Sequence, residues 1–280
     1  MKYANLHLHS IYSDAQFTPE QLVLIGKALG YKALALTDHE TDGGTKEFAA
    51  YAKAEGVETV TGVEFCGIVD GINVHLTALD FDPEDNGIRS FIQKRIFAQM
   101  EFTRKCVERG LRLGYIQGLK WDDVLDFAPN GAWLCIDSVI RAMQLKKLVS
   151  ADYDWERFRA NVFKGPEIRE YRPDKVSACE VIETVRKAGG VVALAHPAKQ
   201  THLVEKLVSY GLNGIEVCHP HIDETDTALA KEAADVFRLY RCGGTDHTGP
   251  MSGCGGENAI PAFHGVTEEE FFTIKERKLG

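Results

Sequence analysis

The sequence predicts an α/β protein in which strands and helices alternate around a seven-stranded (β/α)7 barrel, interrupted by a small helical domain. Over residues 1–85, short apolar strands alternate with amphipathic helices, which is the pattern of βα units and a parallel sheet. Over 86–169, helical patterns follow one another without a clear strand. The alternation returns over 170–280. We therefore expect a barrel built from 1–85 and 170–280, with 86–169 as a helical insertion that covers its site.

Four strands and two helices are expected before the insertion. The strands cover residues 3–10, 32–37, 57–63 and 72–79. Thr18 and Pro19 suit the cap and first position of a helix, and this helix should end near Gly30. A second, alanine-rich helix is expected over 45–55.

Three strands and four helices are expected after the insertion. The strands cover residues 191–195, 214–219 and 239–244. The helices cover residues 174–187, 201–210, 223–238 and 267–278. Because the parallel strands of a barrel end at one common edge, we expect the side chains at those ends to lie close together.

The bulk composition is that of a globular protein with a sizeable core, since 44% of the 280 residues are hydrophobic and 26% are charged. The sequence holds no run of 18 apolar residues and no signal-peptide pattern, so we expect a cytoplasmic protein without a membrane partner. No obligate protein partner is indicated. The net charge of −9 argues against a nucleic-acid coat. Between Arg89 and Arg172, however, 16 basic residues exceed 11 acidic ones, so this segment could face an anion.

The first strand ends in His7-Leu8-His9. Residues two apart on a strand share one face, so both imidazoles should lie side by side. Two imidazoles held on one strand are suitably oriented to bind a metal ion. A histidine pair without a role is the alternative interpretation, and the presence of further ligands decides between the two.

Histidine or acidic residues stand at or near the ends of all seven expected strands. They are His7 and His9, Asp38 and His39, Glu64, His75, His196, Glu216 with His219, and Asp246 with His247. Imidazoles and carboxylates without an evident thiolate suit Mn, Fe or Zn better than Ca or Mg. Together with Asp14, these residues exceed the four ligands that one zinc ion takes, so two or three divalent metal ions are expected.

Such a site favours hydrolysis of a phosphate ester. Neighbouring metals can stabilise the attacking and leaving oxygens and generate hydroxide near neutral pH, and Glu64 could bridge them. We therefore predict a metal-dependent phosphoric ester hydrolase whose metal-bridging hydroxide attacks phosphorus. No side-chain nucleophile is indicated, because the sequence lacks Gly-x-Ser-x-Gly. Asp38 is a possible proton donor, and orientation of a nearby imidazole or a helix cap are its alternatives.

These motifs resemble those of the PHP (polymerase and histidinol phosphatase) superfamily. The matching stretches are His7-Leu8-His9-Ser10, Thr37-Asp38-His39, Gly62-Val63-Glu64, His75, Ala195-His196-Pro197 and Gly244-Thr245-Asp246-His247. They occur in the family's order over about 1–82 and 174–250. Among PHP proteins the chain is most similar to the stand-alone, TrpH-like phosphoesterases. Those proteins carry a small helical domain inserted into a distorted seven-stranded barrel, and the insertion expected here has the same position.

The resemblance implies a trinuclear site with Mn, Fe or Zn. One metal would be held by His7, His9, Glu64 and Asp246, a second by Glu64, His75 and His196, and a third by Asp14, His39 and His247. It also implies a small phosphorylated substrate such as a nucleotide. Related proteins hydrolyse phosphomonoesters, nucleoside bisphosphates or the 5′ ends of short oligoribonucleotides, so a 5′–3′ exonuclease on short oligonucleotides is an alternative.

Two departures from the family pattern concern the substrate. The family's His-Pro motif is often followed by an arginine for the substrate phosphate, whereas Ala198-Lys199 follows here. Lys199 could neutralise a phosphate but lacks the bidentate fork of arginine. The family insertion often carries Gly-Arg-Pro-His, where this chain has Leu134-Cys135-Ile136-Asp137. The metal chemistry is thus expected to be retained, while the substrate contacts differ.

Several interpretations stay open on sequence alone. An amidohydrolase-like hydrolase also begins with His-x-His, although that fold expects eight strands and commonly a modified bridging lysine. A non-catalytic metal-binding module is a further alternative. His219 and His221 could be additional ligands or face solvent, and Glu216 could orient a ligand. The tryptophans Trp121, Trp133 and Trp155 could stack on a base or belong to the core of the insertion.

Overall fold

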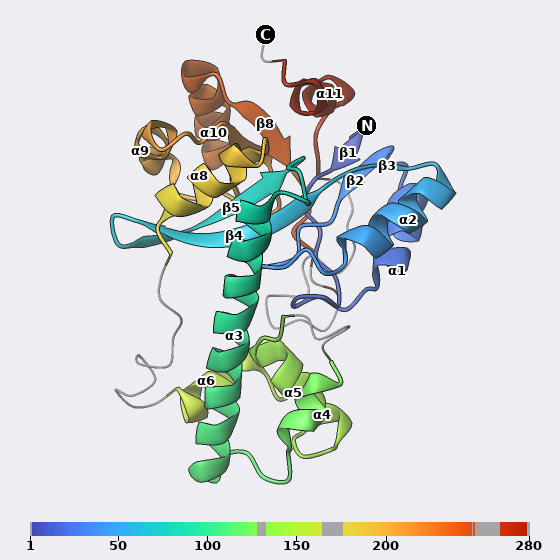
Figure 1. The fold of residues 1–280 in the computed structure, drawn as a ribbon, viewed down its shortest axis with the longest axis vertical. Helices are drawn as coiled ribbons and strands as arrows, with labels where there is room; N and C mark the ends of the chain where they lie inside the picture. Colours follow the sequence, from blue (N-terminus) through green and yellow to red (C-terminus); the bar gives the residue numbers. More distant parts are fainter. Residues whose placement is uncertain (1, 128–132, 164–175, 248, 250–263, 279–280) are drawn as a thin grey trace.

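A computed structural model describes residues 2–127, 133–163, 176–247, 249 and 264–278 of the chain (Figure 1). These residues form a three-stranded sheet, a five-stranded sheet and a group of helices around the far end of the long helix α3. The mixed α/β class expected from the sequence is therefore confirmed. None of the described helices has the length and apolar character needed to cross a membrane.

The first sheet is parallel and contains, in order, β1 (Ala4–Asn5), β2 (Ala33–Ala35) and β3 (Glu58–Val60). Its strands are connected by α1 (Pro19–Ala28) and α2 (Thr45–Glu55). Thr18 caps α1 as predicted, and Gly30 follows that helix with a φ of 90°. The expected strand over 3–10 is shorter in the structure. One reason is that the Leu8 N–H donates to the hydroxyl of Thr37 and not to a neighbouring strand's carbonyl.

The second sheet contains five strands in the order β4-β5-β6-β7-β8. Their bounds are β4 (Gly62–Val69), β5 (Ile72–Leu79), β6 (Val191–Leu194), β7 (Gly214–Cys218) and β8 (Tyr240–Gly243). The expectation of uniformly parallel strands was wrong, because β5 is antiparallel to both β4 and β6. A two-residue turn at Asp70 and Gly71, with φ values of 51° and 79°, joins β4 and β5 into a hairpin.

The two sheets approach each other at two isolated bridges. Leu8 pairs with His247, and His39 pairs with Glu64. In the described part of the chain there are eight strands in two sheets and no closed seven-stranded barrel. The expected strand over 57–63 is divided into β3 and the start of β4, which accounts for the additional strand. Since both bridges include candidate ligands, the candidate site lies where the two sheets meet.

Helices in the second half of the chain pack on the five-stranded sheet, and the last of them, α11, also packs on the three-stranded sheet. They are α8 (Ala178–Lys187), the 3₁₀ helix η2 (Thr201–Leu203), α9 (Val204–Ser209), α10 (Glu224–Phe237) and α11 (Glu268–Glu276). The helix expected from 174 begins later, at Ala178, because the Ser177 hydroxyl accepts the Cys179 N–H and caps it. Val181 and Val185 of α8 pack with Phe65 and Leu76 of the sheet in one large core, which fixes the strands that carry the site.

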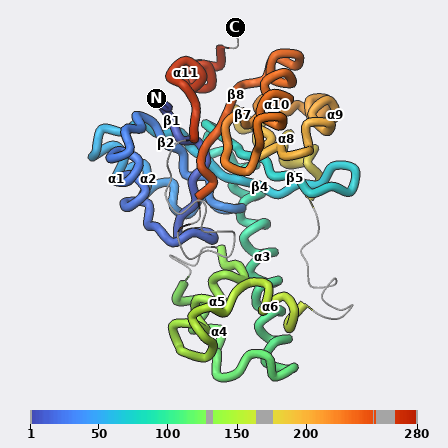
Figure 2. Tube along the Cα trace, turned by 180° about the vertical axis from the view of Figure 1, so that it is seen from behind, coloured from blue at the N-terminus to red at the C-terminus, as the bar shows by residue number. Residues whose placement is uncertain are grey.

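The segment after β5 contains the helices α3 (Asn86–Arg112), α4 (Trp121–Leu125), α5 (Ile136–Leu145) and α6 (Trp155–Val162). Ile88 and Phe91, early in α3, belong to the core of the second sheet. Cys106, later in α3, belongs to a second hydrophobic cluster whose buried members all lie between residues 102 and 162. Figures 1 and 2 show α3 as the element that joins the sheets to this group. The expected boundary at residue 169 lies outside the described residues.

Candidate metal centre

The buried carboxylate of Glu64 is the centre of the site. Glu64 lies near the start of β4, and five imidazole nitrogens approach its two oxygens at 3.0–3.3 Å. They belong to His7, His9, His39, His75 and His196. The antiparallel hairpin explains one of them: His75 pairs with Cys66, two residues from Glu64 on the same face, so its ring reaches the carboxylate. The structure thus places five of the predicted ligands around a sixth, Glu64.

His7 and His9 point the same way, as their spacing predicts. Their Nε2 atoms are 3.2 Å apart, and His9 Nε2 lies 2.9 Å from Oδ1 of Asp246. Leu6 and Leu8 are buried in two separate hydrophobic clusters away from the imidazoles. The segment after β1 is therefore anchored by its leucines and presents both imidazoles to the junction between the sheets.

Asp14 and His247 lie at the edge of this cluster. Asp14 is 3.7 Å from Nε2 of His39 and 3.8 Å from Nδ1 of His9. His247 is buried, with its ring stacked on Phe17 at 5.5 Å between centroids. Burial, followed by the neighbouring His9, lowers the pKa of His247 to about 4, which keeps its imidazole neutral as a ligand must be.

Unpaired polar atoms show that the cluster fits metal ions. Within the described residues, Nδ1 of His9, Oε2 of Glu64 and both ring nitrogens of His247 are buried without a hydrogen bond. Such groups cost free energy unless a partner satisfies them. Four of the predicted ligands, His7, His9, Glu64 and Asp246, place one donor atom each within 4.8 Å of one another. Imidazole and carboxylate donors in this arrangement suit a divalent transition metal.

The electrostatics of the cluster favour a cation. Burial by itself lowers the pKa of His7, but Glu216 and Glu64 outweigh this effect and raise it to about 10. Burial raises the pKa of Glu64, yet the surrounding imidazoles hold it well below its usual range. The carboxylates therefore attract positive charge to the space between them, and a metal cation would replace the protons there.

Buried carboxylates outside the cluster hold its ligands in place. Oε1 of Glu216 lies 2.8 Å from Nδ1 of His7, so Glu216 orients the ring of a predicted ligand. Asp38 accepts hydrogen bonds from the Ser10 N–H and from the hydroxyls of Ser10 and Ser13. These bonds hold the loop that follows His9.

His219, His221 and Lys199 differ in burial and in their distance from the cluster. His219 is buried, and its Nε2 lies 3.4 Å from Asp246, whereas the His221 side chain is 47% exposed. The Nδ1 atom of His219 accepts the backbone N–H of His221, so Nε2 carries the proton in the neutral ring, and this buried Nε2 forms no hydrogen bond with the described residues. Lys199 is exposed after β6 and does not line the cavity beside the cluster. No sequence pattern indicated that His219 would be buried while His221 and Lys199 would be exposed.

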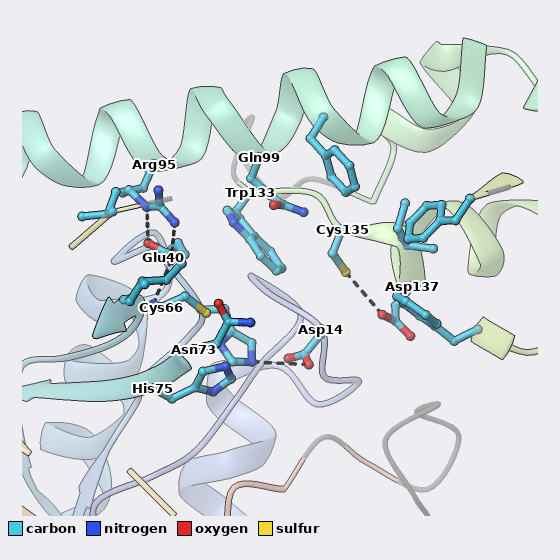
Figure 3. A pocket seen from close by; sticks show the side chains of 18 residues that line it. Asp14, Glu40, Cys66, Asn73, His75, Arg95, Gln99, Trp133, Cys135 and Asp137 are labelled. Atoms are coloured by element: carbon cyan, nitrogen blue, oxygen red, sulfur yellow. Dashed lines mark hydrogen bonds and ion pairs between the residues drawn. The ribbon is translucent and has the colours of Figure 1, made fainter. Parts of the chain in front are cut away.

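A cavity of about 410 Å³ opens beside the cluster (Figure 3). Asp14, His39 and His75 form one side of it. Helix α3 and the start of α5 form the opposite side, where Trp133 and Asp137 are found. Trp133 and Trp155 line the cavity, and Trp121 and Trp155 pack against the hydrophobic cluster of the helical segment.

Side chains from the helical segment also bind the sheet side of the cavity. Arg95 of α3 forms a bidentate ion pair with Glu40, with both N–O distances at 2.8 Å. Arg141 of α5 donates to the backbone carbonyls of Asp14 and Ala15. The second contact was not foreseen, because it joins positions more than 120 residues apart.

The fold and this cluster define a metal-binding α/β protein with its donor set at the junction of two sheets. The chain belongs to the PHP domain family, whose model matches residues 5–239. The family expectation from the sequence is therefore confirmed.

Named relatives and a solved structure agree with this assignment. A phosphoribosyl 1,2-cyclic phosphate 1,2-diphosphodiesterase of Eggerthella lenta is 27% identical and covers 88% of this chain and 94% of its own. A 5′-3′ exoribonuclease of Haemophilus influenzae is 28% identical, and the match covers 88% of this chain and 89% of the relative. A 3′,5′-nucleoside bisphosphate phosphatase of Chromobacterium violaceum is 25% identical, covering 90% of each. The fold is shared with a Bifidobacterium adolescentis protein assigned to the metal-dependent phosphoesterases, at a TM-score of 0.81 and 22% identity. The match covers 100% of this chain and 97% of that protein.

Proposed function

We propose that this chain is a metal-dependent phosphoesterase that hydrolyses a phosphate ester of a nucleotide or another small phosphorylated metabolite. The observation that carries the proposal is Glu64, a buried carboxylate with five imidazoles at 3.0–3.3 Å beside a cavity of about 410 Å³. Membership of the PHP family and the activities named for its relatives support a phosphoric ester as the bond that is cleaved.

The proposed metal ligands form three overlapping sets. They are His7, His9, Glu64 and Asp246; Glu64, His75 and His196; and Asp14, His39 and His247. Glu64 would be shared because each of its oxygens faces different imidazoles. The donor types suit Mn, Fe or Zn, and the number of ligands suits two or three ions.

Bound divalent metals would supply Lewis acidity and a nucleophilic water near neutral pH. The chain's own residues supply position and charge. Glu216 fixes the ring of His7 through Nδ1, which leaves Nε2 for the site. Burial of Glu64 excludes bulk water from the centre, so charges placed there interact strongly with a bound phosphate.

The division of the chain belongs to the same proposal. We place the metal-binding unit in 1–85 and 170–280, as a distorted seven-stranded barrel, and the helical insertion in 86–169. The bridges Leu8–His247 and His39–Glu64 support a barrel-like closure because they join both sheets. The separate hydrophobic cluster between residues 102 and 162 supports an insertion with its own core, which covers the site.

Lys199 is proposed as a contact to the substrate phosphate from the turn after His196. Its φ of 56° and the bond from its backbone N–H to Asp226 hold this turn in place, while its side chain is exposed. A lysine there could meet a phosphate that enters from solvent. Lys199→Met should raise KM for the ester more than it lowers kcat, and an unchanged KM would exclude this contact.

The proposed function is tested with the purified chain after metal analysis and reconstitution with Mn, Fe or Zn. We expect release of inorganic phosphate from at least one member of a panel of nucleotides and sugar phosphates. His9→Ala should abolish release, whereas His202→Ala, at an exposed position on η2, should not. Circular dichroism checks that both variants fold. A metal-loaded chain that releases phosphate from none of the panel would contradict the proposal.

A 5′–3′ exoribonuclease is the second candidate, because a relative with that activity matches 88% of the chain. Short 5′-phosphorylated oligoribonucleotides distinguish the two activities: an exonuclease releases mononucleotides, and a phosphatase releases inorganic phosphate. The limited volume of the cavity favours the smaller ester.

A further inference from the structure

The cavity beside the metal centre is rich in aromatic and acidic side chains. Its lining includes the rings of Phe102, Trp133, Trp155 and Phe163. The ring of Trp133 lies 6.0 Å from that of His39, so the aromatic wall begins directly beside a proposed ligand. A planar ring attached to a phosphate ester could therefore stack there while its phosphate reaches the metals.

Trp133 also offers a polar contact that nothing in the described chain uses. Its side chain is 7% exposed, and its indole N–H is buried without a hydrogen-bond partner among the described residues. Figure 3 shows the ring between α3 and the His75 side of the cavity, near Gln99 and Asn73. A ligand atom that accepts a hydrogen bond would satisfy this donor, whereas a purely hydrocarbon group would not.

The positive charge available to a second phosphate is small. Of the described residues that line the cavity, Arg95 is the only arginine or lysine. Its guanidinium is already engaged by both oxygens of Glu40, and Glu40 in turn accepts the Cys66 N–H. Because a phosphate would have to displace this bidentate pair, Arg95 is poorly suited to bind one.

The start of α5 faces the cavity, and such a helix end normally attracts anions. Here Cys135, Ile136 and Asp137 line the cavity, and Asp137 places a carboxylate in the first turn of the helix. Figure 3 shows Asp137 across the cavity from Asp14. The Asp137 carboxylate thus balances the partial positive charge at the start of α5, and its negative charge would repel a second phosphate.

We propose, resting on the phosphoesterase function above, that the substrate is a singly phosphorylated ester carrying an uncharged aromatic ring, and that Asp137 disfavours a second phosphate. The ring stacks on the aromatic wall and accepts the Trp133 N–H. The cleaved phosphate lies at the metal cluster. Asp137 is then a specificity-determining residue.

The test uses the metal-loaded, full-length chain and four esters: adenosine 5′-monophosphate, adenosine 3′-monophosphate, adenosine 3′,5′-bisphosphate and ribose 5-phosphate. We expect kcat/KM for the better monophosphate to exceed that for the bisphosphate and that for ribose 5-phosphate by about tenfold or more. Adenosine, which lacks a phosphate, should inhibit competitively, and ribose should not. Adenosine inhibition reports on binding at the ring site by a compound that has no phosphate to release.

Asp137→Asn keeps the shape of the side chain and removes its charge. It should raise kcat/KM for the bisphosphate relative to the monophosphate by about tenfold, because the repulsion is lost. Glu156→Gln, at an exposed position of α6, is the matched control and should leave the ratio unchanged. Two results with the unmodified chain would overturn this inference but leave the proposed function standing. One is an equal kcat/KM for the monophosphate and the bisphosphate, and the other is an equal kcat/KM for the monophosphate and ribose 5-phosphate. Phosphate release from no ester at all would instead overturn the proposed function and this inference with it.

Discussion

Oε1 of Glu216 lies 2.8 Å from Nδ1 of His7, and both side chains are fully buried. The other oxygen of Glu216 accepts the backbone N–H of His196 at 2.7 Å. One carboxylate of β7 therefore orients a proposed ligand from the first strand and holds the backbone of a second ligand after β6. Because Nδ1 is occupied, Nε2 of His7 is the nitrogen directed at Glu64.

Glu216→Gln should lower the affinity for the metal about 10–100-fold without removing a ligand. The amide keeps the shape of the side chain but loses the charge that supports the His7 ring. Metal affinity is measured by competition with a chelator of known strength. Glu205→Gln, at an exposed position of α9, is the control and should leave the affinity unchanged. Equal affinities for all three proteins would show that Glu216 has no such role.

Asp38→Asn should destabilise the fold and the site together. Its carboxylate accepts three hydrogen bonds, from the N–H of Ser10 and from the hydroxyls of Ser10 and Ser13, which hold the loop after His9. We expect the free energy of unfolding to fall by about 2–3 kcal/mol, the scale of bonds to a buried charged acceptor. Urea denaturation measures this loss, and Asp122→Asn on the exposed side of α4 is the comparison. A loss below 0.5 kcal/mol, on the scale of ordinary surface changes, would contradict the anchoring role.

Strand ends and a two-residue spacing explain why several of the proposed ligands lie close together. His7, His9 and Glu64 converge for these local reasons. The direction of β5 was predicted wrongly, although the chain contains the signal: Asp70-Gly71 between two apolar runs is a two-residue hairpin turn. With that turn recognised, the antiparallel pairing follows from the sequence.

Other features could not be read from the sequence because they join distant positions. Glu216 reaches His7 across 209 residues, and Arg141 reaches Asp14 across 127. The side of the cavity on which Trp133 lies depends on how α3 carries the helical group over the sheets. Local patterns indicate that such residues are polar or apolar, but they do not indicate which partner each one finds.

Removal of metal should destabilise the chain. Without a cation, two buried atoms, Oε2 of Glu64 and Nδ1 of His9, have no hydrogen-bond partner among the described residues. At a free Mn concentration about 100 times its Kd, binding should add about 2.7 kcal/mol to the free energy of unfolding. Thermal melts of chelator-treated protein, with and without added Mn, measure the difference. The gain should be much smaller in His9→Ala, and a chelator-treated chain that melts at the same temperature with and without Mn would argue against a metal site in the folded state.

Gly244→Ala should impair the metal site although Gly244 is not a proposed ligand. A Cβ atom built on Gly244 would lie 2.4 Å from the backbone nitrogen of His7 and 2.5 Å from its Cβ. Both distances are shorter than real contacts permit, so the first strand must move away from the end of β8 and carry His7 and His9 with it. Since a ligand must be placed within about 0.5 Å, we expect metal affinity to fall at least tenfold.

The matched comparison for this glycine is Gly56→Ala. Gly56 has a φ of 70° at the end of α2 and open space around it, so alanine there costs backbone strain alone. Gly56→Ala should lower the free energy of unfolding by about 1 kcal/mol and leave the metal affinity unchanged. Gly244→Ala should lower both. If the two variants lose stability equally and both keep full metal affinity, the close approach of β8 to His7 does not position the ligands, and the site must tolerate a shift of its first strand.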